Sequence, residues 1–71
     1  MRSFVDDGGR SWQAVVGKES YGSLMLLFSA EGSGKMRRLA LPAASRLEAE
    51  NRLAHSTDDE LRAWLREAEP T

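Results

Sequence analysis

The residues best suited to contact a charged or aromatic partner lie in the stretch Lys35-Met36-Arg37-Arg38, which has the composition of a basic strand. Arg10 and Trp12 lie on an earlier strand, and Tyr21 is the only tyrosine. Arginine side chains contact phosphates and aromatic rings stack on bases, and this combination binds single-stranded nucleic acid. The candidate contact surface, for a protein partner or for nucleic acid, therefore consists of Arg10, Trp12, Tyr21, Arg37 and Arg38.

The basic strand also has a purely structural explanation. Charged side chains on an edge strand keep that strand from pairing with other chains. Nucleic-acid domains usually carry a strong basic excess, whereas this chain has a net charge of -1 and an isoelectric point near 5.7. Arg37 and Arg38 should point to opposite faces of the sheet, and the sequence does not decide which of them faces outward.

Other groups that could do chemistry are better explained as turns and helix caps. The run Gly32-Ser33-Gly34-Lys35 is glycine-rich, but a phosphate-binding loop needs a longer glycine spacing and a Lys-Ser/Thr pair that opens a helix. His55, the only histidine, precedes a helix cap and has no free nucleophile nearby in the sequence. The acidic runs Asp6-Asp7 and Asp58-Asp59-Glu60 fall short of the roughly six oxygens that a hard cation prefers. We expect no catalytic site, no cofactor and no metal.

Length and composition predict a single domain over residues 1–71. The 71 residues include no cysteine, so neither a disulfide nor a thiolate metal site can add stability to a small core. The acidic pair Asp6-Asp7 comes before any apolar stretch long enough for a signal peptide, and no run approaches the roughly 20 residues that span a bilayer. These features predict a cytoplasmic protein that does not contact a membrane.

The sheet part of the domain, residues 1–41, shows the pattern of four short strands. Phe4 and Val5 precede the turn sequence Asp6-Asp7-Gly8-Gly9, and alternation then indicates a strand over residues 10–16. Two further strands, over 23–29 and 35–41, are separated by a glycine-rich turn. Short turns favour antiparallel pairing, so the sequence predicts a mostly antiparallel β-meander.

The third of these strands is apolar on both faces, with the sequence Leu24-Met25-Leu26-Leu27-Phe28 at its centre. Helices that cover one face of the sheet leave the other face to be met by curling, by another helix or by a partner. The sequence does not decide which side chains of this strand meet the helices.

The helical part, residues 42–71, contains two capping signatures. Ser45-Arg46-Leu47-Glu48 and Thr57-Asp58-Asp59-Glu60 each fit a capping box, in which two side chains accept each other's backbone N–H. The second helix carries one apolar stripe made of Leu61, Trp64, Leu65 and Ala68. We expect Trp64 to be the main anchor between this helix and the sheet.

The chain also resembles small hypothetical proteins of high-GC bacterial genomes. The resemblance rests on Arg2-x-Phe4-Val5-Asp6-x-x-Gly9-Arg10-x-Trp12, Tyr21-Gly22, Ser45-x-x-Glu48-Ala49-Glu50 and Asp59-Glu60-Leu61. It implies a free-standing bacterial domain, and it transfers neither an activity nor a site residue.

These observations together predict an α+β domain, with a four-stranded antiparallel meander followed by two C-terminal helices on one face. The function expected is a small non-enzymatic protein-interaction or regulatory module whose partner is an unknown protein or a second copy of the chain. A nucleic-acid-binding module is the alternative. The predicted core consists of Phe4, Trp12, Ala14, Val16, Leu24, Leu26, Phe28, Leu39, Leu61, Trp64 and Leu65.

Overall fold

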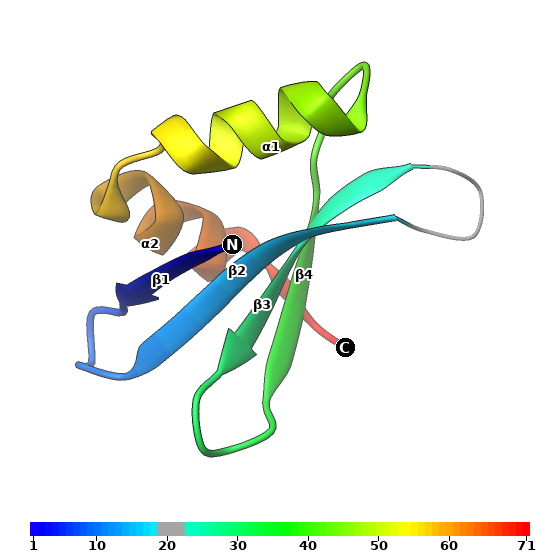
Figure 1. The fold of residues 1–71 in the computed structure, drawn as a ribbon. Coiled ribbons are helices and arrows are strands. Elements are labelled where there is room, and N and C mark those ends of the chain that lie inside the picture. Colours follow the sequence, from blue (N-terminus) through cyan, green and yellow to red (C-terminus); the bar gives the residue numbers. More distant parts are fainter. Residues whose placement is uncertain (19–22) are drawn as a thin grey trace.

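The computed structural model describes residues 1–18 and 23–71 and has the α+β architecture that the sequence predicts (Figure 1). The strands and helices follow one another as β1 (Arg2–Val5), β2 (Ser11–Lys18), β3 (Leu24–Ala30), β4 (Met36–Ala40), α1 (Arg46–His55), α2 (Asp58–Glu67) and β5 (Glu69–Pro70).

The sheet has the order β1-β2-β3-β4-β5, and every neighbouring pair is antiparallel. The predicted meander of four strands is therefore confirmed. β5 was not predicted, because two residues that include a proline carry no alternation pattern. Its pairing with β4 returns the chain to the sheet after α2.

The first turn forms as the Asp-Asp-Gly-Gly sequence indicates. The Asp6 Oδ1 atom accepts hydrogen bonds from the backbone N–H groups of Gly8 and Arg10, each at 2.9 Å. Gly9 takes a φ of 84°, a conformation in which a side chain would be strained. The turn thus joins β1 to β2 and places the second oxygen of the Asp6 carboxylate toward the sheet.

The two helix caps differ. At α2, the Thr57 hydroxyl accepts from the Glu60 backbone N–H and the Glu60 carboxylate accepts from the Thr57 N–H, so the predicted capping box is complete. At α1, Ser45 accepts from the Glu48 N–H, but the Glu48 carboxylate accepts from the Ala44 N–H instead of the Ser45 N–H. The reciprocal bond predicted for α1 is therefore wrong by one residue.

Both helices lie on the same side of the sheet (Figure 1), and the buried residues of β1, β2 and β3 all belong to the parity that faces them. Trp64 is only partly buried and packs at the margin, so it is not the main anchor that we predicted; Leu61 and Leu65 fill that role. Leu24 and Leu39, also predicted as core, are likewise partly buried. The buried core comprises Phe4, Trp12, Ala14, Val16, Leu26, Phe28, Ala30, Leu41, Ala49, Leu53, Leu61, Leu65 and Ala68.

Candidate functional site

Trp12 belongs to the core and not to an exposed surface. Its side chain is buried, with a relative exposure of 4%. The indole Nε1–H donates to the Asp6 Oδ2 atom at 2.8 Å, so the only polar atom of the ring has a partner. A ring held in this way on the covered face offers no stacking surface to a base.

The Asp6 carboxylate connects the first turn to this tryptophan. The hydrogen bond from the Trp12 indole is the largest cause that lowers the pKa of Asp6, followed by the bond from the Arg10 backbone N–H. Donors that bind the ionised form favour it over the protonated form. Asp6 is therefore held as an anion and is a structural acceptor.

Arg37 and Arg38 point to opposite faces, as strand alternation predicts. Arg37 pairs in register with Phe28 on the covered face, where its guanidinium carbon lies 5.9 Å from the centroid of the Trp12 ring. It also donates to the backbone carbonyl of Leu65 at 3.3 Å. Arg38 pairs with Leu27 on the opposite face and is exposed. Arg38 is thus the outward arginine.

Among the described residues, the structure brings Trp12 and Arg37 together but separates this pair from Arg10 and Arg38. Trp12 and Arg37 lie under the helices, Arg38 lies on the other face, and Arg10 is exposed beside the first turn. Tyr21 lies outside the residues that the structure describes. Within residues 1–18 and 23–71 we find no continuous surface that combines exposed aromatic rings with these arginines.

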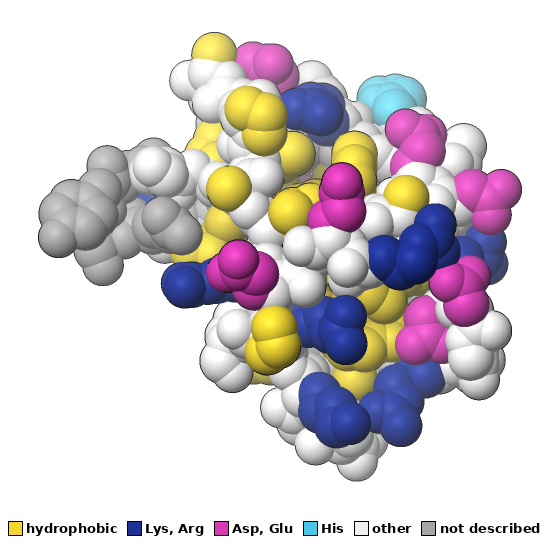
Figure 2. Space-filling model, turned by 180° about the vertical axis from the view of Figure 1, so that it is seen from behind, with side chains coloured by type: hydrophobic (Ala, Val, Ile, Leu, Met, Phe, Trp, Pro, Cys, Tyr) yellow, Lys and Arg dark blue, Asp and Glu magenta, His cyan; other side chains and the backbone are white. Residues whose placement is uncertain are grey.

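Most other arginines bind the backbone of the protein itself. Arg46 donates to the Val16 carbonyl at 3.3 Å, Arg62 to the Val5 carbonyl at 2.7 Å, and Arg2 to the Ser56 carbonyl at 2.6 Å. Figure 2 shows one face of the molecule, on which basic and acidic side chains are interspersed. Because these guanidinium groups already bind carbonyls and carboxylates, the basic side chains act mainly as connections between the helices and the sheet.

The face of the sheet turned away from the helices is apolar at its centre. In each strand the residues there alternate with the buried ones, and the register places Val15, Leu27 and Arg38 in one row across β2, β3 and β4. Neither Val15 nor Leu27 belongs to the core or to the hydrophobic residues packed against it. We call this surface the open face; its central residues are Gln13, Val15, Gly17, Met25, Leu27, Ser29, Met36, Arg38 and Ala40.

The apolar side chains of the open face pack against one another. Leu27 lies over Gly17, so close that a Cβ atom at Gly17 would be 2.8 Å from the Leu27 Cδ1 atom. Val15, Met25 and Leu27 are half-buried, although in the described part of the chain no helix covers them. Met36 is 41% exposed beside them. The second apolar side of β3, visible in the sequence, is therefore a continuous patch on an uncovered sheet.

The described residues provide no site for a metal or a membrane span. No group of three or more His, Asp or Glu side chains in residues 1–18 and 23–71 is placed to hold a metal ion. No helix in this part of the chain has the length and apolar character needed to cross a membrane.

Comparison with known proteins gives no further guide to function. No protein-family model matches the chain, and no match is found among curated proteins or solved structures.

Proposed function

We propose that this protein is a small non-enzymatic interaction module, and that its open face binds a second copy of the same chain. The observation that carries the proposal is the patch of Val15, Met25 and Leu27 on a sheet face that no helix within residues 1–18 and 23–71 covers. Two twisted sheets pack face to face at about 30° with their apolar side chains interlocked, as in β-sandwiches. Such a pairing would cover the patch on both copies at once.

The area of the open face suits a weak dimer. The two central strands have eight and seven residues. With a spacing of about 4.8 Å between strands and a rise of about 3.3 Å per residue, the projected area of the face is roughly 400 to 500 Å². Two such faces would bury on the order of 1,000 Å² together, near the lower bound for a specific interface. Interfaces of this size are typical of weak, transient complexes, so we expect a dissociation constant in the micromolar range.

The charge of the open face permits self-association. Three described side chains on this face are ionised. Arg38 on β4 and Glu69 on β5 are opposite in sign and adjacent in register, and Glu31, just after β3, accepts a hydrogen bond from Gln13 at 3.4 Å. These three side chains sum to a net charge of -1, which repels an identical copy only weakly. Dimerisation would also stabilise a domain of this size, because its own core buries only a limited share of its apolar surface.

Sedimentation equilibrium of the full chain tests the proposal over about 1 to 300 μM. The wild type should change from monomer to dimer in this range, and Leu27→Glu should remain monomeric because a buried charge without a partner is costly. Ala40→Glu provides a second variant at an exposed position of the same face, so a folding defect at Leu27 would not decide the result. The control is Leu47→Glu, the same change at a 71% exposed leucine on α1.

The outcomes separate the candidate functions. Loss of the dimer in Leu27→Glu and Ala40→Glu, but not in Leu47→Glu, would support the proposal. A wild type that stays monomeric throughout, or a dimer that only Leu47→Glu disrupts, would overturn it. Nucleic acid that copurifies with the protein and is lost in Arg10→Ala and Arg38→Ala would favour the nucleic-acid alternative instead.

A further inference from the structure

β5 covers only a small part of the outer edge of β4. It has two residues, which pair Pro70 with Arg37 and Glu69 with Arg38. One more bond runs from the Thr71 N–H to the Met36 carbonyl at 3.2 Å. Proline has no backbone N–H to donate, and all three residues of the segment are exposed. The edge of β4 is therefore held by few hydrogen bonds.

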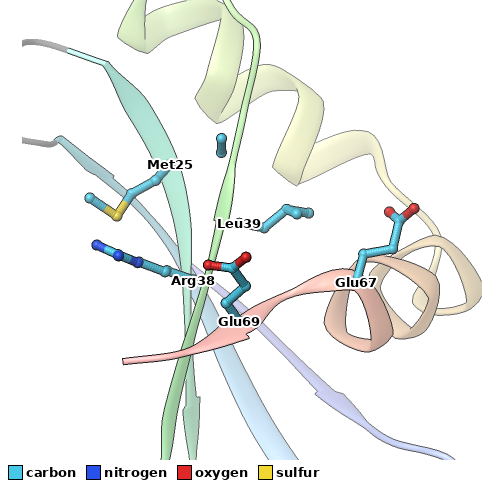
Figure 3. Close-up of a pocket in the computed structure, with 6 residues that line it drawn as sticks. Met25, Arg38, Leu39, Glu67 and Glu69 are labelled. Atoms are coloured by element: carbon cyan, nitrogen blue, oxygen red, sulfur yellow. The ribbon is translucent and has the colours of Figure 1, made fainter.

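Open space lies along the β4 edge on both sides of β5. Figure 3 shows the first hollow, of about 280 Å³, with Arg38 and Met25 on one side and Glu67 and Glu69 on the other. The second hollow, of about 490 Å³, lies at the other end of β5 and is lined by residues 34–37 and 70–71. A longer strand than β5 would thus find room along β4 from Lys35 to Ala40.

The chain can leave this edge without disturbing the core. Ala68, the residue before β5, is buried, and its N–H donates to the Trp64 carbonyl at 3.0 Å and to the Leu65 carbonyl at 3.2 Å. These contacts fix the end of α2 independently of the residues that follow. The segment from Glu69 onward is consequently a separable cover on the edge of β4.

Charge identifies the kind of strand that fits the edge. β4 and the residue before it carry Lys35, Arg37 and Arg38, whereas β5 supplies a single acid, Glu69, opposite Arg38. The chain's own cover is therefore an extended segment with a carboxylate beside the outward arginine. Opposite charges on facing positions of neighbouring strands stabilise the pairing.

We propose that the outer edge of β4 binds an extended acidic segment of a partner protein, which adds to the sheet as a strand in place of β5. Backbone hydrogen bonds along the edge would supply the affinity, and Arg38 the preference for an acidic side chain. The backbone groups at the outer edge of β4 differ from the side-chain surface of the open face, although the Arg38 side chain belongs to both.

Fluorescence anisotropy with a labelled peptide, Thr-Val-Glu-Val-Glu-Thr, tests this inference. The probe should bind the full chain weakly, and it should bind a chain that ends at Ala68 about tenfold more tightly. This ratio is expected if β5 occupies the edge in about nine tenths of the full-length molecules. Arg38→Glu should abolish binding in both backgrounds. The control peptide Thr-Val-Lys-Val-Lys-Thr should not bind, and the control variant Leu47→Glu, at an exposed position on α1, should bind the acidic probe as the wild type does.

Three results would overturn the inference. The first is no binding of the acidic peptide by a shortened chain whose circular dichroism matches that of the full chain. The second is equal binding of the acidic and basic peptides. The third is self-association of the shortened chain that removes peptide binding, since the edge would then pair with a second copy. Circular dichroism of the shortened chain also shows whether the domain folds without β5.

Discussion

Leu27 on β3 lies over Gly17 on β2, where an added Cβ atom would be 2.8 Å from the Leu27 Cδ1 atom. The absence of a side chain at Gly17 lets Leu27 lie flat on the open face. Gly17 does not have a positive φ, so alanine is compatible with the backbone at this position. The contact is thus a matter of space and not of backbone strain.

Gly17→Ala should weaken self-association more than it changes stability. The new methyl group pushes Leu27 off the sheet, which alters the shape of the apolar patch. Alanine lowers the entropy of the unfolded chain, and this gain offsets much of the displacement, so we expect a change within about 1 kcal/mol in the free energy of unfolding. Sedimentation and urea unfolding of the same samples measure the two effects. A large loss of stability with an unchanged dimer would contradict the assignment.

Arg37 and Arg38 should differ in their effects on stability. Arg37→Ala removes a contact with the Trp12 ring and a bond to the Leu65 carbonyl, and we expect it to cost about 1 to 2 kcal/mol. Arg38→Ala removes an exposed side chain from the open face, and the expected effect is within about 0.5 kcal/mol. Chemical denaturation followed by tryptophan fluorescence compares the two variants. Equal effects would show that Arg37 does not join the sheet to α2.

Asp6→Asn should destabilise the protein at neutral pH. One carboxylate oxygen accepts from the turn N–H groups and the other from the Trp12 indole, whereas an amide has a single acceptor oxygen. The pKa of Asp6 is lowered from its ordinary value of 3.8, chiefly by the Trp12 hydrogen bond. The stabilisation from the ionised form is therefore present above about pH 4 and is lost as the pH falls through the lowered pKa.

Urea unfolding of wild type and Asp6→Asn between pH 2 and 7 measures this dependence. The difference in unfolding free energy between the two proteins should be largest near neutral pH and should shrink on acidification below about pH 4. A difference that stays constant over the whole range would mean that the Asp6 charge contributes nothing to folding.

Thr57→Ala should cost about 1 kcal/mol, within the usual range for the loss of a helix N-cap. Thr57 and Glu60 form both bonds of the box at α2, whereas Ser45 at α1 accepts only the bond from Glu48. Thr57→Ala and Ser45→Ala each remove one side-chain bond, so we expect similar costs from the two variants. Thermal unfolding of both variants under identical conditions measures these costs, and a cost near zero at either cap would contradict the geometry.

Much of the fold follows from local patterns in the sequence. Turn chemistry at Asp6 and Gly9 and the cap at Thr57 act over a few residues, so they predict the first hairpin and the start of α2 correctly. Alternation along β2 also predicts that Trp12, Ala14 and Val16 are buried. Each of these features depends on neighbouring residues, which is the information that a sequence displays directly.

The features that escaped prediction depend on contacts between distant segments. The parity of β3 that is buried is decided by α1 and α2, and the sequence of β3 is apolar on both sides. The position of Arg37 over Trp12 depends on the register of β4, and β5 depends on where α2 ends. The apolar residues Val15, Met25 and Leu27 were visible as a pattern, but only the sheet topology places them together on an uncovered face.

The most direct test of the open face as a self-association surface is a dilution series followed by methyl NMR. Leu27 and Val15 methyl signals should shift between about 1 and 300 μM, and mixed labelled and unlabelled protein should give intermolecular contacts from Leu27. The methyl signals of Leu47, on α1, should stay constant. Concentration-independent Leu27 and Val15 signals, or intermolecular contacts that arise only from Leu47, would contradict the proposed role of the open face.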